Sequence, residues 1–171
     1  PGRQIQLAES VVVIDGPAAE EPAVKKLLAG IPRAGSPLKH ADYEAFKSAL
    51  DNLALSEGYF DAEFETSRLE VSVKKGEARW VITWHSGERW RFGQTVFEGS
   101  QIDEDRLTSL VPYRNNEAFS ADRAAALSKN LSATGWFQSV AVTPEFSRAA
   151  DRTLPMRAAV TPRAKNEVEL G

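Results

Sequence analysis

The stretches Ser56–Phe64, SEGYFDAEF, and Ala133–Val142, ATGWFQSVAV, decide the fold of this chain. Each stretch has a glycine followed by two aromatic residues, and each follows a run whose apolar residues have helical spacing. The two glycines, Gly58 and Gly135, lie 77 residues apart. Because glycine readily adopts the left-handed conformation that ends many helices, both stretches predict the end of a helix and the start of a strand. The sequence therefore indicates two copies of one unit.

A strand and a short helix precede that helix in both copies. The first strand ends at Gly16 after SVVVID, and its counterpart ends at Gly99 after GQTVFE. After each glycine, apolar residues recur at helical spacing, and a proline follows that terminates the helix. These positions are Val24, Leu27, Leu28 and Pro32 in the first copy, and Leu107, Leu110, Val111 and Pro112 in the second. The order of elements is thus the same in both copies.

A second helix in each copy leads to the glycine, and two strands follow it. The apolar stripe of this helix is Tyr43, Phe46, Leu50 and Leu53 in the first copy, and Ala124, Leu127 and Leu131 in the second. Asp42 and Ser120 are predicted to cap the two helices at their N-termini. Alternating apolar residues then predict strands that begin at Phe60 and near Trp80 in the first copy, and strands over 137–143 and 154–161 in the second.

The predicted fold class is α+β, with two tandem β-α-α-β-β domains. Each domain is expected to have a three-stranded mixed sheet with both helices on one face. We place the first domain at residues 1–90 and the second at residues 91–171. The strand after the second helix is predicted to lie at the sheet edge, because acidic residues alternate along it in the first copy and Pro144 lies in it in the second.

The composition is that of an ordinary globular protein. Of 171 residues, 42% are hydrophobic and 26% are charged. The net charge of −3 and the pI of about 5.5 argue against binding to nucleic-acid phosphates. The absence of cysteine excludes disulfides and thiolate sites, and no apolar run approaches the roughly 18 residues of a membrane helix. Since the chain begins at Pro1 without an initiator methionine, we expect it to be part of a longer protein.

The sequence patterns disfavour two other function classes. An enzyme is disfavoured, because no catalytic or nucleotide-binding motif accompanies the two histidines, His40 at a helix start and His85 in a strand. We therefore predict no catalytic residue, no metal site and no cofactor. A KH-like RNA-binding module also mixes helices with a three-stranded sheet, but it needs a GxxG loop. Here Gly30 and Gly35 are separated by IPRA, so neither the loop nor the charge supports that alternative.

Three segments of the chain resemble a known family. They are GERWRFGQTVFEGSQI at 87–102, LVPYRNNEAFSADRAAALSKNLSATGWFQSVAVTPEF at 110–146 and VTPRAKNEVELG at 160–171. These segments resemble the periplasmic polypeptide-transport-associated (POTRA) domains of TamA-type proteins, which belong to the superfamily that also holds BamA and the two-partner-secretion transporters. The POTRA order β-α-α-β-β agrees with the order predicted above. Proteins of this type carry three POTRA domains before an outer-membrane β-barrel.

The resemblance implies a place and a set of partners. The chain would hold the second and third POTRA domains, and NEVELG at 166–171 would lead into the first barrel strand. It would lie at the periplasmic face of the bacterial outer membrane and serve outer-membrane protein assembly and autotransporter biogenesis. The implied partners are a TamB-like inner-membrane-anchored periplasmic protein and unfolded client polypeptides, with no cofactor. The alternative is an arm of a BamA-like or two-partner-secretion transporter.

The resemblance also implies binding by β-augmentation, in which a partner strand adds to the edge strand after the second helix. The candidate docking residues are Asp61, Glu63 and Glu65 in the first copy and Ser139, Val140 and Val142 in the second. The alternative for the acidic residues is a solvated edge that prevents aggregation.

The aromatic residues are interpreted as structural. Tyr59 and Trp136 are predicted to pack back on the preceding helix, and Phe60 and Phe137 to enter the core. Trp90 and Phe92 are expected to set the angle between the domains. Trp80, Trp84 and Trp90 either belong to the core or to interdomain packing, because large aromatic residues are mostly buried, or they form an exposed peptide groove.

Overall fold

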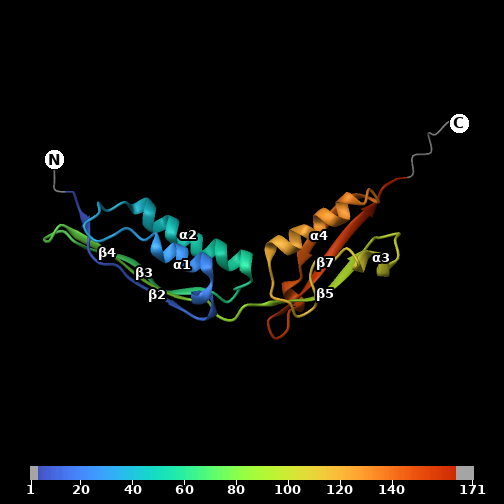
Figure 1. The fold of residues 1–171 in the computed structure, drawn as a ribbon, viewed down its shortest axis with the longest axis horizontal. Coiled ribbons are helices and arrows are strands. Elements are labelled where there is room, and N and C mark those ends of the chain that lie inside the picture. Colours follow the sequence, from blue (N-terminus) through green and yellow to red (C-terminus); the bar gives the residue numbers. More distant parts are fainter. Residues whose placement is uncertain (1–3, 165–171) are drawn as a thin grey trace. The chain divides into compact units, whose positions relative to one another are not determined.

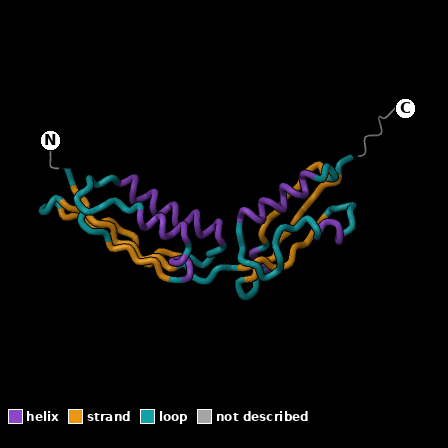
Figure 2. Tube along the Cα trace, in the orientation of Figure 1, coloured by secondary structure: helices purple, strands orange, loops and turns teal. Residues whose placement is uncertain are grey.

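The computed structural model describes residues 4–164, and the chain divides into two compact units between Arg89 and Trp90 (Figure 1). The elements of the first unit are β1 (Gln6–Leu7), β2 (Val11–Asp15), the 3₁₀ helix η1 (Pro17–Glu20), α1 (Pro22–Ala29), α2 (His40–Glu57), β3 (Glu63–Ser72) and β4 (Glu77–His85). β4 is the central strand, parallel to β1 and β2 on one side and antiparallel to β3 on the other. The helices lie over one face of this sheet (Figure 2).

The second unit repeats this arrangement. Its elements are β5 (Arg91–Glu98), α3 (Glu104–Thr108), α4 (Ala121–Ala133), β6 (Phe137–Pro144), the 3₁₀ helix η2 (Phe146–Arg148) and β7 (Thr153–Pro162). The central strand β7 is parallel to β5 and antiparallel to β6. The predicted fold class, two tandem β-α-α-β-β units with mixed sheets, is confirmed.

The core of the first unit lies between β4 and the two helices. Trp80, Ile82 and Trp84 alternate along β4 and are each at most 1% exposed, as are Val24 of α1 and Leu50 of α2. Period-two alternation directs these β4 side chains to the helix layer. Trp80 and Trp84 are therefore core residues and do not form an exposed groove.

The core of the second unit is built around Phe92 of β5, which is fully buried. Its ring stacks on that of Tyr113 with the centroids 3.7 Å apart, and the ring of Phe119 lies 4.9 Å away. Trp90 contacts Phe146 of the same unit, with ring centroids 6.1 Å apart. Both Trp90 and Phe92 thus pack within the second unit, and their effect on the angle between the units stays a prediction.

Both glycines of the repeated stretch have the left-handed conformation that the sequence predicts, with φ of 83° at Gly58 and 75° at Gly135. Phe137 enters the core as predicted, but in the first unit the buried aromatic is Tyr59 and Phe60 is only half-buried. The two copies differ because β3 begins five residues after its glycine, whereas β6 begins two residues after. The longer connection lets Tyr59 take the core position.

Several element boundaries differ from the predicted ones. α2 begins at His40 after Lys39, so Asp42 lies in the first turn and does not cap the helix. Ser120 does cap α4, since its hydroxyl accepts a hydrogen bond from the amide of Arg123 at 3.4 Å. α3 ends at Thr108, and Leu110 and Val111 lie beyond it. There the amides bond three residues back, at 3.0 and 3.1 Å, so a tight turn replaces the helix.

The first strand of the first unit is interrupted, which the sequence did not predict. β1 pairs with β4 at Glu77 and Ala78, and β2 resumes the same side of β4 from Val81 onward. β1 and β2 therefore act as two segments of one edge. A strand of two residues, such as β1, is too short for a period-two pattern to reveal it.

Candidate functional site

The strands that follow the second helix are both edge strands. β3 pairs with β4 and β6 pairs with β7, and no other strand in residues 4–164 pairs with either of them. An edge strand has unpaired N–H and C=O groups along its outer side, which an extended segment of another chain can bind. The predicted docking edges are therefore present as unpaired edges, while docking itself stays a prediction.

The structure places the three acidic candidates of the first unit differently from one another. Asp61 lies in the turn before β3, so it is not a strand residue. Glu63 is the first residue of β3, and Glu65 lies at a register shift between Phe64 and Thr66. This β-bulge interrupts the ladder and twists the edge. The regular part of the β3 edge is the segment from Thr66 to Ser72.

The candidates of the second unit lie on a more regular edge. Ser139, Val140 and Val142 pair with Thr161, Val160 and Ala158 of β7, after a register shift between Phe137 and Ser139. The strand has no charged residue from Phe137 to Pro144. The two predicted edges thus differ chemically, because β3 has Glu63, Glu65, Arg68 and Glu70.

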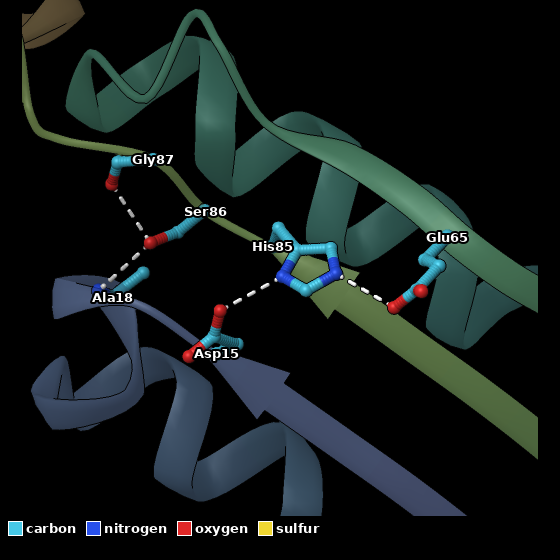
Figure 3. A network of polar contacts seen from close by, with 6 residues as sticks. All are labelled: Asp15, Ala18, Glu65, His85, Ser86 and Gly87. Atoms are coloured by element: carbon cyan, nitrogen blue, oxygen red, sulfur yellow. Dashed lines mark hydrogen bonds and ion pairs between the residues drawn. The ribbon is translucent and has the colours of Figure 1, made fainter.

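A histidine joins β2, β3 and β4 at one end of the first sheet (Figure 3). His85 ends β4, its Nδ1 lies 2.8 Å from Oδ2 of Asp15 in β2, and its Nε2 lies 2.8 Å from Oε2 of Glu65 in β3. Because a carboxylate only accepts hydrogen bonds, both ring nitrogens donate here, which is the protonated form of the ring. The hydrogen bonds to Glu65 and then to Asp15 raise the pKa of His85 above its ordinary value.

The sequence did not reveal this cluster. Asp15 and Glu65 are 70 and 20 residues from His85 along the chain, and only the strand register and the bulge at Glu65 bring them together. No spacing pattern corresponds to that geometry.

The residue after His85 anchors the chain as it leaves β4. Ser86 is fully buried, its hydroxyl accepts a hydrogen bond from the amide of Ala18 at 3.3 Å, and it donates to the carbonyl of Gly87 at 2.9 Å (Figure 3). A Cβ at Gly16 would lie 2.3 Å from this hydroxyl. Because Gly16 has no Cβ, it leaves room for the Ser86 hydroxyl.

A second polar network holds Arg89. Its guanidinium donates to Glu57 at 2.7 Å and lies 3.6 Å from Glu21, which accepts a hydrogen bond from the Tyr59 hydroxyl at 2.8 Å. Burial, and then the hydrogen bond to Glu21, raise the pKa of Tyr59. Tyr59 therefore remains a hydrogen-bond donor, and we assign this network a structural role.

Neither histidine belongs to a recognisable catalytic set. His40 pairs with Glu44 of the same helix at 3.5 Å, and each ring nitrogen of His85 contacts a carboxylate at 2.8 Å. Within residues 4–164, no three His, Asp or Glu side chains are grouped so that they could hold a metal ion. None of the helices in that range combines the length and the apolar character that crossing a membrane requires.

Replacing Glu65 by glutamine is expected to lower the pKa of His85, and replacing Asp15 by asparagine is expected to lower it less, because Glu65 makes the larger contribution. Since the folded-state pKa is raised, the contacts of His85 with Asp15 and Glu65 stabilise the unit fully below the unfolded pKa of about 6.5, and this stabilisation is lost as the pH rises through the folded value. NMR titration of the His85 ring measures the pKa in all three proteins. Equal pKa values in the three proteins would contradict the assignment.

Comparison with known proteins supports the fold independently. Residues 91–170, slightly less than half of the chain, match the POTRA family model, described as surface antigen variable number repeat. BamA from Haemophilus ducreyi lacking POTRA domains 1–3 is similar in structure, with a TM-score of 0.67 and 13% identity over 92% of this chain and 29% of that one. POTRA domains 3–5 of Haemophilus influenzae BamA give a TM-score of 0.61 and 17% identity over 94% of this chain and 62% of that one.

These similarities show that both units have the POTRA fold, in tandem as in the two BamA structures. The family match in addition covers the second unit, which begins at Trp90. The chain spans less than two thirds of either BamA structure.

Proposed function

We propose that this chain is a non-catalytic periplasmic arm of an Omp85-type outer-membrane protein, in which tandem POTRA domains position client segments beside a membrane barrel. The observation that carries the proposal is the pair of POTRA folds, each with an unpaired edge strand, β3 and β6. Main-chain hydrogen bonds along such an edge provide affinity with little demand on sequence. That suits a protein that handles many different unfolded clients.

The finer assignment also belongs to this proposal. We propose a TamA-type protein that serves autotransporter biogenesis and works with a TamB-like inner-membrane-anchored partner, because the segments at 87–102 and 110–146 resemble that type. The second candidate is a BamA-like arm, favoured by the two similar BamA structures. A pull-down from bacterial envelopes that recovers a periplasm-spanning protein favours the first, and recovery of lipoproteins favours the second. The third resembling segment ends in NEVELG, which lies outside the described residues.

Proline at Glu63 and at Val142 is expected to weaken binding of a urea-denatured outer-membrane β-barrel protein by about tenfold, because proline has no N–H to donate to an added strand. Fluorescence anisotropy of the labelled barrel protein, diluted from urea into the chain, measures the affinity. Circular dichroism checks that each variant keeps its fold.

The matched control is Lys74→Pro. Lys74 is the second residue of the turn from Val73 to Gly76, which is closed by a hydrogen bond of 3.2 Å, and proline is favoured at that turn position. It should leave the affinity unchanged. Binding that survives both edge prolines in folded variants would rule out docking at the Glu63 end of β3 and on β6.

A further inference from the structure

The sheet of the first unit has one face that its helices leave open. The helices described in this unit lie over the other face (Figure 2). Along β4, Trp80, Ile82 and Trp84 point to the helices and are buried, so the residues between them point to the open face. On β2 the side chains of that face are Val11 and Val13, which are 45% and 47% exposed.

The centre of the open face is uncharged. In the strand register, Val11 lies beside Val81, and Val13 and Thr66 lie on either side of Thr83. Side chains at paired positions of neighbouring strands share a face of the sheet. The centre therefore consists of valine side chains and threonine side chains with their methyl groups.

One end of the open face has a carboxylate between two guanidiniums. Oε2 of Glu70 lies 2.9 Å from Nε of Arg68, and its Oε1 lies 2.8 Å from Nη2 of Arg79. The hydrogen bonds from Arg68 and then from Arg79 lower the pKa of Glu70. Two guanidiniums and one carboxylate give these three residues, the basic cluster, a net charge of +1.

The other end has the reverse arrangement. There the ring of His85 lies between the carboxylates of Asp15 and Glu65, at 2.8 Å from each (Figure 3). Two carboxylates and one protonated ring give these three residues, the acidic cluster, a net charge of −1. His85 and Arg79 of the basic cluster are six residues apart on β4, so they point to the same face and lie about 20 Å apart.

The neighbouring charges strengthen this polarity. Glu63, which pairs with His85 in the register of β3 and β4, adds a negative charge beside the acidic cluster. At the other end, the turn between β3 and β4 adds Lys74 and Lys75, and the start of β4 adds only Glu77 against them. The open face is therefore positive at one end and negative at the other.

We propose that the open face is a contact surface between two copies of this chain, related by a two-fold axis that passes near the middle of β4. In such a contact the same surface of both copies meets in reversed orientation. The basic cluster of each copy then lies over the acidic cluster of the other. The valines of the two centres pack against one another, as in two sheets stacked about 10 Å apart.

A second copy fits this face better than a partner with charge of one sign, because such a partner matches only one of the two ends. The contact uses side chains of the sheet face and no main-chain group of an edge strand. Three strands about 4.8 Å apart and about 20 Å long provide a small interface. The dimer is therefore weak, and it weakens further as the salt concentration rises.

The test reverses the charge of each end separately. Arg68→Glu with Arg79→Glu makes both ends of the face negative, and Asp15→Lys with Glu65→Lys makes both ends positive. Each double variant alone is expected to self-associate at least about tenfold more weakly than the unchanged chain, whereas an equimolar mixture of the two should associate again. Sedimentation equilibrium of the 171-residue chain at up to about 1 mM measures the association.

The matched control is Lys25→Glu with Lys26→Glu. Both lysines are exposed on α1 in the helix layer, and their replacement changes the net charge as much as the first double variant does. It should leave the association within about twofold. Circular dichroism checks each fold. Should a charge-reversed variant lose its fold, Val13→Lys, which places a charge in the uncharged centre, tests the same contact by an expected tenfold loss, about 1.4 kcal/mol.

The location is measured by NMR, in which the amide signals of Val11, Val13 and Val81 should shift as the concentration rises. A chain that stays monomeric at about 1 mM would overturn the proposal. So would a dimer that neither double variant weakens, or a mixture that does not restore association. No client or envelope protein takes part in this experiment, so its failure leaves the proposed function untouched.

Discussion

Trp80→Ala is expected to lower the free energy of unfolding of the first unit by about 3–5 kcal/mol, the usual cost of truncating a large buried aromatic residue. Trp80 is 1% exposed and contacts the rings of Tyr43 and Phe46 in α2, at centroid distances of 5.7 and 5.6 Å. Its removal leaves a cavity between β4 and α2, which packing can refill only partly. Urea unfolding, monitored through hydrogen exchange of the β4 amides, measures the loss of unfolding free energy.

The control for this substitution is Val73→Ala. Val73 lies in the turn between β3 and β4 and is 85% exposed, so the change should stay within about 0.5 kcal/mol. If both substitutions have equally small effects, Trp80 is not part of the core and the packing of helices on this sheet is wrong.

Gly99→Ala is expected to destabilise the second unit by about 2–5 kcal/mol. Gly99 has φ of 83°, which costs a non-glycine residue about 1–2 kcal/mol. A Cβ there would also lie 2.3 Å from the backbone carbonyl oxygen of Val160 in the central strand β7. Backbone of a paired strand cannot move without loss of its ladder, so overpacking adds about 1–3 kcal/mol.

Gly135→Ala separates these two contributions. Gly135 has a similar φ of 75°, but a Cβ there meets no atom within 4 Å. Its cost should therefore be that of the backbone conformation alone, about 1–2 kcal/mol. Urea unfolding of both variants at one pH compares them. Equal losses would show that β7 yields to the Cβ and that the close contact at Gly99 contributes nothing.

The order of elements could be predicted from the sequence because each depends on local signals. These signals are the glycines at 58 and 135, the apolar stripes of the helices and the alternation in the strands, and each depends only on nearby residues. Because they recur in both copies, each copy supports the assignment of the other. Helix and strand boundaries were less predictable. Asp42 resembles a cap in isolation, but α2 starts at His40 because the chain before it is already placed by the bonds of residues 35–38 to β1.

The docking candidates could likewise be predicted only in part. Alternating acidic residues and Pro144 predicted that β3 and β6 lie at sheet edges, and the pairing with β4 and β7 places them there. The bulge at Glu65 could not be predicted, because a bulge is a mismatch between two strands and belongs to neither sequence alone. The same holds for the β2 edge, whose opening depends on where the segment 35–38 stops covering it.

The sequence by itself determined the repeat, the fold class and the apolar stripes, because hydrophobic periodicity and glycine conformation act over a few residues. Only the tertiary structure decided that His85 joins Asp15 to Glu65, that Tyr59 takes the core position its repeat gives to Phe137, and that β2 is left uncovered. The histidine cluster depends on strand register. The Tyr59 position depends on the length of the connection to β3, and the open β2 edge depends on where the segment 35–38 ends. Contacts between residues 20 to 70 positions apart, as in the histidine cluster, follow from the packing of whole strands and helices against one another.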